Sequence, residues 1–269
     1  MEQNEGPVVR QQASGTQAIH RALTVLRCIA RSRNEGIGLS ALSKQAGLIK
    51  STTHRLTTAL IAEGLVEQEP ASRRYYLGSA CHALGLIAAD RYGLHKTAAR
   101  HVARLAHETG DAAFFSVRQD VHAICLLRIE GGYPLKSHAL LAGDRHPLGV
   151  GAGSLAMLAA LDDAQVEHCI QENLEYISAN YPRYNTEVLH GLVQRTRDRG
   201  YSVNPGLVLS GSLGIGMAVR GENGEIVGAL SIATVEGRLG PEREAELARA
   251  LEREVGKLQK SLRMQALSG

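Results

Sequence analysis

One short segment gathers side chains that could bind DNA. Residues 50–55 read Lys-Ser-Thr-Thr-His-Arg, which places two cations, three hydroxyls and an imidazole in six consecutive positions. Lysine and arginine suit phosphates and guanine edges, and the exposed amides at a helix start add partial positive charge. We expect DNA contacts from the whole run, which is Lys50, Ser51, Thr52, Thr53, His54 and Arg55. The alternative for Ser51 is a helix N-cap, and Thr57 and Thr58 are expected at the surface.

A second basic group lies where a β-hairpin is expected. The segments 65–68 and 75–77 have strand-like composition and enclose Pro-Ala-Ser-Arg-Arg at residues 70–74. A hairpin in this place would form a wing, and we expect Arg73 and Arg74 at its tip to contact the DNA backbone or the minor groove. The alternative is a charged tip that contacts nothing.

The elements that present these residues follow from apolar spacing and from glycine positions. Apolar residues recur every three or four positions over 17–31, which predicts a first helix. The segment 39–46 and the segment from Leu48 onwards predict two short helices separated by Gly47. Two short helices joined by a glycine turn, the second polar at its start, are typical of a helix-turn-helix. A further helix is expected over 79–92.

Two other motifs favour an enzyme only weakly. Residues 149–154, Gly-Val-Gly-Ala-Gly-Ser, resemble a dinucleotide-binding loop but lack its last glycine and a surrounding parallel βαβ unit. Residues 210–214, Ser-Gly-Ser-Leu-Gly, resemble a nucleophile elbow but begin with serine, and no strand-turn-helix follows. We therefore expect no enzyme. We expect a DNA-binding protein that responds to a ligand. Two other functions are weighed against it: a DNA-architectural protein without a ligand and, least favoured, a small-molecule enzyme.

The distribution of charge separates the two ends of the chain. Its 269 residues suffice for two domains. Residues 1–92 carry 11 Lys and Arg against 7 Asp and Glu, whereas residues 93–269 carry 19 against 20. A basic first third suits a DNA-binding module joined to a neutral domain.

The cysteines and the N-terminal segment indicate an intracellular protein. Cys28, Cys81, Cys125 and Cys169 lie more than 40 residues apart, which predicts buried thiols in a reducing cytosol and no metal site. The first residues lack the apolar stretch of a signal peptide, and no run approaches the roughly 20 apolar residues that cross a bilayer. We expect a soluble, cytoplasmic protein with no metal, no cofactor and no membrane contact.

Residues beyond 94 predict an α+β domain with an antiparallel sheet. Helices are expected over 95–108, 151–161, 163–172, 187–199 and 241–264. Strands are expected over 112–118, 121–129, 135–141, 214–220 and 225–234.

Taken together, several segments resemble the IclR family of bacterial transcription regulators. The matching segments are 18–26, 39–48, 50–56, 76–78, 146–148, 151–153 and 199–201, and the strand and helix that begin at Ile226. The resemblance covers about residues 16–264. It implies an N-terminal winged helix-turn-helix, a linker helix and a C-terminal GAF-like effector domain.

This resemblance also sets the expected organisation and partners. We expect a disordered arm at 1–15, the winged helix-turn-helix at 16–78, a linker helix at 79–93, and an effector-binding and oligomerisation domain at 94–269. The implied partners are a double-stranded DNA operator, a small organic acid or related effector, and further copies of the chain as a homodimer or a dimer of dimers. Two-fold symmetry predicts a near-palindromic operator.

The family's effector pocket maps onto nine positions of this chain. They are Leu135, His138, His146, Gly151, Ala152, Asn204, Gly214, Ser231 and Ala233. Residues 204–209 lack the acidic residues of many members, Gly214 stands where a cysteine is common, and Ala233 where a serine can occur. From these departures we expect a roomier, less polar pocket and an aromatic or otherwise bulky ligand.

Several polar groups are candidates for binding an acidic ligand. Amides near Gly151, together with His138 or His146, could hold a carboxylate. The alternative for each histidine is a surface or sheet-edge position. Ser210 and Ser212 either donate hydrogen bonds to the ligand or shape a turn.

Overall fold

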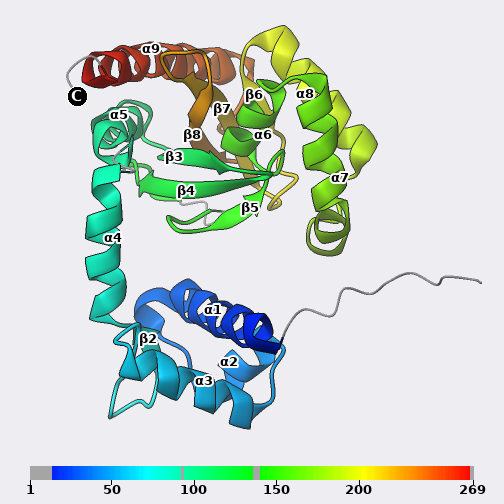
Figure 1. The fold of residues 1–269 in the computed structure, drawn as a ribbon. Helices are drawn as coiled ribbons and strands as arrows, with labels where there is room; N and C mark the ends of the chain where they lie inside the picture. The colour runs from blue at the N-terminus through cyan, green and yellow to red at the C-terminus, as the bar shows by residue number, and fades with distance from the viewer. Residues whose placement is uncertain (1–13, 92–93, 136–139, 267–269) are drawn as a thin grey trace, which may run out of the picture. The chain divides into compact units, whose positions relative to one another are not determined.

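The chain forms two compact units, Met1–Tyr92 and Gly93–Gly269 (Figure 1). The structure, a computed structural model, describes residues 14–91, 94–135 and 140–266. The expected arm at 1–15 lies almost entirely outside the described residues, and its last two residues begin the first helix.

The first unit is a three-helix bundle with a small hairpin and a following helix. Its helices are α1 (Ser14–Ser32), α2 (Leu39–Ala46), α3 (Lys50–Ala62) and α4 (Ser79–Arg91), with a short 3₁₀ turn at Arg33–Glu35. Its strands are β1 (Val66–Gln68) and β2 (Tyr75–Leu77). The buried core is formed by Val25, Cys28, Ile29, Ile37, Leu42, Leu60, Val66 and Tyr75. Because this core draws on α1, α2, α3 and the hairpin, it fixes how α3 is held.

The turn between α2 and α3 is tightly specified. Gly47 ends α2 in the left-handed conformation at φ 64°, which a residue with a side chain rarely adopts. The Ser43 hydroxyl donates to the Leu48 carbonyl at 2.6 Å, and the Leu48 amide donates to the Ser43 carbonyl at 3.0 Å. The predicted helix-turn-helix is confirmed, with α3 beginning at Lys50.

The hairpin packs back on the helices. β1 and β2 are antiparallel, with Val66 opposite Leu77. Ile37 bridges Tyr75 through two backbone hydrogen bonds of 3.1 and 2.9 Å, which adds a third short extended segment. The hairpin therefore has the place of a wing beside α3.

The second unit is built on one six-stranded antiparallel sheet of order β5-β4-β3-β8-β7-β6 (Figure 1). The strands are β3 (Ala112–Gln119), β4 (His122–Ile129), β5 (Arg145–Pro147), β6 (Ser202–Asn204), β7 (Ser212–Arg220) and β8 (Ile226–Val235). The helices are α5 (Leu94–Thr109), α6 (Ala152–Ala159), α7 (Asp163–Asn180), α8 (Thr186–Arg199) and α9 (Pro241–Ala266). The predicted α+β class is confirmed.

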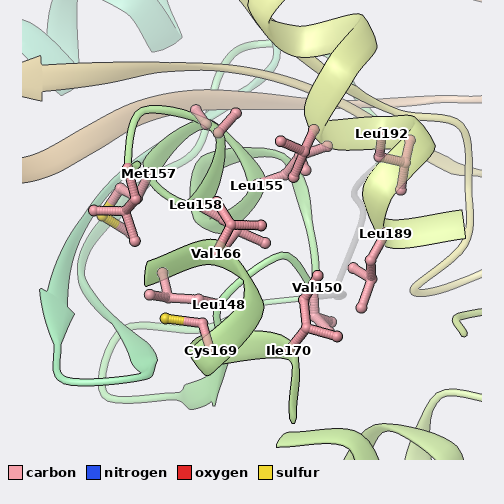
Figure 2. Close-up of a cluster of buried hydrophobic side chains, with 14 of the residues drawn as sticks. Leu148, Val150, Leu155, Met157, Leu158, Val166, Cys169, Ile170, Leu189 and Leu192 are labelled. Atoms are coloured by element: carbon pink, nitrogen blue, oxygen red, sulfur yellow. The ribbon is translucent and has the colours of Figure 1, made fainter. Parts of the chain in front are cut away.

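Helices cover both faces of this sheet. α5 and α9 pack on one face, where Phe115, Ile215, Leu230 and Leu251 are among the buried side chains. On the other face α6 crosses the central strands, and α7 and α8 pack around it. Figure 2 shows the core of this second layer, in which side chains such as Leu155, Ile170 and Leu189 from the three helices converge.

The start of α6 lies directly against the sheet. A Cβ atom on Gly216 would come within 2.8 Å of the Ala152 backbone, so only glycine permits this approach. The Ser202 hydroxyl donates to the Ala152 carbonyl at 2.6 Å from the neighbouring strand. The first turn of α6 is thereby fixed over β7 and β6.

Two predicted elements differ from the structure. The strand predicted over 135–141 is wrong in its described residues, because Leu135, Leu140 and Leu141 are not in a strand and β4 pairs instead with the short β5. The helix predicted over 163–172 continues to Asn180. Asn173, the polar residue at which the pattern breaks, is buried, and its side-chain amide donates to the carbonyls of Val121 and Cys169. The short strands β5 and β6 were not predicted.

Candidate functional sites

The exposed face of α3 carries a polar and basic stripe. Ser51, His54, Arg55 and Thr58 are exposed at spacings of three and four, and Lys50 is exposed at the helix start. The opposite face is buried against the core through Thr53, Leu56, Thr57 and Leu60. Thr58 was expected only as surface, and its place on the same stripe adds it to the candidates. Spacing on a known helix is the signal that identifies it.

One predicted contact residue, Thr53, lies in the interior. Its side chain is 0 % exposed, and its hydroxyl donates to the Ile49 carbonyl at 3.1 Å. Thr53 therefore cannot present its side chain to DNA. Thr57, expected at the surface, is also buried, and its hydroxyl donates to the His54 carbonyl at 2.9 Å.

The start of α3 favours an anion. The N-cap is Ile49, whose side chain cannot cap the helix, so Ser51 lies inside the helix rather than at its cap. The first turn contains no acidic residue and includes Lys50. Unsatisfied amides and a cation at the same end attract phosphate groups.

The two arginines of the wing have different roles. Arg73 is exposed in the hairpin turn, at φ 57°. Arg74 is exposed too, but its guanidinium donates to the carbonyls of Glu35 and Gly36 at 2.8 and 3.0 Å. The Arg74 side chain therefore has a structural role, since it ties the wing to the 3₁₀ turn. This role competes with the predicted DNA contact.

α4 exposes an unusual amount of apolar surface. Leu84, Leu86 and Ile87 are 58 %, 59 % and 73 % exposed in this helix. On α1, Ile19 and Leu23 are exposed one turn apart. Grouped apolar side chains of this size on a surface indicate an interaction site.

In the second unit, most of the positions expected at the effector site lie together on the α6 face of the sheet. Asn204 pairs with Gly214, Gly214 with Ala233, and Ala233 with Ala112, which forms one row across four strands. Ser231 lies in the adjacent row, and a Cβ on Gly153 at the start of α6 would be 3.0 Å from its hydroxyl oxygen. Because both rows lie beneath the first turn of α6, we call this group the sheet-α6 site.

A chain of hydrogen bonds crosses the sheet-α6 site. The Gly151 amide donates to the Tyr184 hydroxyl at 3.2 Å, and that hydroxyl donates to Asn204 Oδ1 at 3.4 Å. Burial raises the pKa of Tyr184 to about 12, with a smaller raising effect from Tyr181 and an opposing one from the Gly151 amide. The Gly151 amide, expected as a partner for a ligand carboxylate, is thus already engaged. The amides of Ala152 and Gly153 remain the candidates in that turn. Sequence reasoning missed Tyr184.

Gly214 does not leave the open space that was expected. A Cβ on this residue would be 3.2 Å from the Ala152 Cβ and 3.9 Å from the Asn204 Cβ. The missing side chain therefore lets α6 approach the sheet, and the expectation of extra room at Gly214 is wrong.

His146 is buried at the edge strand β5, opposite Ala123. Burial lowers its pKa to about 4, and nearby His122 acts in the same direction. Its Nδ1 atom is buried and has no hydrogen-bond partner within the described part of the chain. A neutral imidazole with an unpaired buried nitrogen is a group that a ligand can satisfy.

Arg128 is a further group that sequence reasoning missed. Its side chain is 8 % exposed, and its guanidinium carbon lies 5.7 Å from the ring centre of Phe114. Phe114 pairs with both Arg128 and Ser231, so the arginine lies in the same row of the sheet-α6 site. Ala112, Phe114 and Cys125 form a small buried cluster here, separate from the two main cores, with Leu140 and Ala233 packed against it. Strand register, which the sequence did not reveal, is what brings these residues together.

The remaining predicted positions lie elsewhere. Leu135 is exposed, and His138 lies outside the described residues. Ser212 is buried at the start of β7 and Ser210 is exposed in the preceding turn. Among the residues that the structure describes, no group of three His, Cys, Asp or Glu could hold a metal ion, and no helix is long and apolar enough to cross a membrane.

A winged helix-turn-helix joined to a separate α+β unit is the architecture of a transcription regulator with a regulatory domain. The family model "Bacterial transcriptional regulator IclR C-terminal" matches residues 87–259, and "IclR helix-turn-helix domain" matches residues 18–70. The chain belongs to the IclR family of DNA-binding transcription regulators.

Similar proteins support this assignment. The glycerol operon regulatory protein of Streptomyces griseus is 30 % identical over 86 % of this chain and 89 % of its own length. The transcriptional repressor IclR of Escherichia coli is 26 % identical over 86 % of this chain and 84 % of its own.

Solved structures share the fold. An IclR regulator of Alicyclobacillus acidocaldarius matches with a TM-score of 0.72 and 25 % identity, covering 93 % of this chain and 98 % of its own. An IclR homologue from Microbacterium hydrocarbonoxydans, solved in complex with 4-hydroxybenzoate, matches with a TM-score of 0.72 and 21 % identity, covering 92 % and 99 %.

Proposed function

We propose that this protein is a cytoplasmic regulator that binds a specific operator through α3 and whose binding is controlled by a small aromatic acid. It acts by binding and not by catalysis. The observation that carries the proposal is the exposed stripe on α3, opposite a face that is buried in the core. Side chains that share one exposed face of a helix can enter a major groove together.

The DNA contacts divide into two kinds. His54, Arg55, Ser51 and Thr58 are placed to face base edges, since they share one side of the helix. Lys50 and Thr52 at the helix start, and Arg73 in the wing, are placed to contact phosphates. Thr53 is excluded, and Arg74 acts mainly within the fold.

A second copy of the chain is the occupant we propose for the apolar surface of α4. Leu84 and Ile87 share one face of α4, and both, like Leu86, are too exposed to contribute to the core of their own unit. A two-fold pair joined there would present two copies of α3, which requires a near-palindromic operator with half-sites about one helical turn apart or a multiple of it. Two such pairs would form a dimer of dimers.

The sheet-α6 site is the proposed effector site. Its Phe114 cluster offers apolar contact, while Arg128 and Ser231, which pair with Phe114 in one row, and the first amides of α6 offer polar groups. An apolar wall with a few convergent polar groups is typical of a small-molecule site. The homologue from Microbacterium hydrocarbonoxydans was solved in complex with an aromatic acid, 4-hydroxybenzoate, which supports the same class of ligand here.

The proposal is tested by fluorescence anisotropy of the full chain on the duplex upstream of its own gene, against a scrambled duplex. The titrations are run across a salt series, with and without aromatic acids. We expect preferential binding to the upstream duplex, weaker at higher salt, that an acid shifts. If genomic selection enriches no sequence and no duplex is preferred, the regulator proposal fails; if binding is specific but no acid alters it, only ligand control fails.

A further inference from the structure

Arg128 is an almost buried cation beside the Phe114 ring. Only 8 % of its side chain is exposed, yet it carries a permanent charge over the Phe114 ring. A buried guanidinium requires a carboxylate or several acceptors, because an unpaired charge in a protein interior is strongly unfavourable. Its carboxylate partner in this structure is Glu130, reached by Nε at 2.6 Å and by Nη2 at 2.5 Å.

The two members of this ion pair are unequally buried. The Glu130 side chain is 40 % exposed, five times as much as that of Arg128. The glutamate side chain can therefore recover more of its hydration on leaving this pair than the arginine side chain, which is buried beside Phe114. A second carboxylate that reaches the guanidinium can replace Glu130 without changing the net charge of the site.

The residues around Arg128 indicate which chemical group should be attached to the ligand's carboxylate. Phe114 lies beneath the guanidinium, and Leu140, Cys125 and Ala233 belong to the same small cluster. Ser231 in the next strand adds a hydroxyl beside the first turn of α6. A flat apolar group joined directly to a carboxylate fits these contacts, because the ring packs on the cluster while the acid meets the arginine.

Resting on the proposed ligand-controlled function, we propose that Arg128 binds the carboxylate of an aromatic acid and that Glu130 is the internal carboxylate this ligand displaces. Arg128 also donates to the Leu140 carbonyl at 2.7 Å, so one guanidinium holds both Glu130 and Leu140, ten positions apart along the chain. Exchange of Glu130 for a ligand releases the attachment to Glu130 while the hydrogen bond to Leu140 remains. Binding of the acid is thereby coupled to Glu130, just after the end of β4.

The test uses calorimetric titration of the full chain with benzoate and 4-hydroxybenzoate, each compared with its uncharged amide. We expect the acids to bind the natural protein about ten-fold or more tightly than the amides. Arg128→Gln should lose this preference, and Arg128→Lys should keep part of it, because lysine retains the charge but not the forked geometry. Glu130→Gln should bind the acids several-fold more tightly, since the competing carboxylate is gone.

Matched controls are available in the same unit. Arg118→Gln, on β3 at the far end of the β3–β4 ladder, and Glu222→Gln, in the turn between β7 and β8, should bind like the natural protein. Thermal unfolding and operator binding are measured for every variant. Should Arg128→Gln fail to fold, Arg128→Lys and Glu130→Gln still decide the question.

Several results would overturn the proposal. These are equal binding of acid and amide, unchanged acid binding in Arg128→Gln or Arg128→Lys, weaker acid binding in Glu130→Gln, and no binding of either acid to the natural protein. Operator binding, measured in the same samples, distinguishes failure of the Arg128 proposal from failure of the proposed regulator function. If it persists while acid binding fails, the regulator remains and only the role of Arg128 is wrong.

Discussion

The hydroxyl group of Tyr184 lies 3.2 Å from the amide nitrogen of Gly151 and accepts its hydrogen bond. The same hydroxyl donates to Asn204, so one phenol joins the residue before α6 to the edge strand β6. With a pKa raised to about 12, the phenol keeps its proton throughout the physiological range and always has one hydrogen to donate. This linkage fixes the start of α6, the part of the helix that lies over the sheet-α6 site.

Replacing Tyr184 with phenylalanine should weaken the second unit. The change leaves the Gly151 amide without its partner, so we expect the free energy of unfolding to fall by about 1–2 kcal/mol. Denaturant unfolding followed by circular dichroism measures the difference. Tyr176→Phe, at an exposed position of α7, should change it by less than about 0.5 kcal/mol. Equal stabilities of Tyr184→Phe and the natural protein would show that this linkage contributes nothing.

Acid should destabilise the protein partly through His146. Its pKa of about 4 in the folded state lies below its ordinary value of 6.5, so the folded state binds this proton less readily than the unfolded state. Its contribution to stability is therefore complete above pH 6.5 and is lost as the pH falls from 6.5 to 4. At about 1.4 kcal/mol per pKa unit, the loss amounts to about 3 kcal/mol at most.

His146→Leu removes this titration, so its stability should fall less than that of the natural protein between pH 6.5 and 4. Unfolding in urea at pH 7, 6, 5 and 4 gives the two curves. His168→Leu, an exposed position of α7, should follow the natural protein. Parallel curves for His146→Leu and the natural protein would mean that His146 is protonated as easily in the folded state as in the unfolded one.

Substitutions at two nearby residues of α3 should have very different effects on DNA binding. Arg55→Ala removes an exposed cation from the polar stripe, and we expect specific binding to weaken by about 1–3 kcal/mol if this side chain contacts a base edge. Thr53→Val removes a hydroxyl that already bonds to Ile49 inside the core, so operator affinity should stay within about two-fold. Anisotropy on the selected operator and on scrambled DNA measures both variants.

A control on the basic first helix completes this comparison. Arg27→Ala, exposed on α1, should affect operator and scrambled DNA alike, because it removes charge without touching the stripe. If Thr53→Val lost as much specific affinity as Arg55→Ala, the assigned orientation of α3 on DNA would be wrong.

The sequence located the DNA-binding unit well because its signals are local. Each signal depends only on residues that are close together in the chain. These signals are Gly47, the apolar spacing of the first helix, and the run from Lys50 to Arg55. The orientation of individual side chains was harder to predict from the sequence. Thr53 and Arg55 are equally polar in the sequence, and only packing on the core decides that one faces inward.

The sheet-α6 site was less predictable because it depends on register between distant strands. Phe114 and Arg128 lie 14 positions apart, and Ser231 lies more than a hundred further, yet all three share one row. Family resemblance supplied Ser231 and Asn204, but nothing in the local pattern indicated Arg128 or Tyr184. The apolar residues over 135–141 favoured a strand, whereas the ladder of β4 pairs with Arg145–Pro147 instead.

The apolar surface of α4 should determine self-association. Full burial of a large aliphatic side chain contributes about 1.5–3 kcal/mol, and a two-fold interface buries each residue twice. The double variant Leu84→Gln and Ile87→Gln should therefore raise the dissociation constant of the dimer by about a hundred-fold or more. Both side chains are exposed within their own unit, so its fold should be unaffected.

Sedimentation velocity over a concentration series gives the dissociation constant, and circular dichroism reports the fold. Met264→Gln, at a position of α9 that is 62 % exposed, serves as the control and should associate like the natural protein. Because a near-palindromic operator needs two copies of α3, the double variant should also lose most of its specific DNA affinity while keeping its weak binding to scrambled DNA. An unchanged dimer would place the interface elsewhere, and an unchanged operator affinity in a monomeric variant would contradict two-fold recognition.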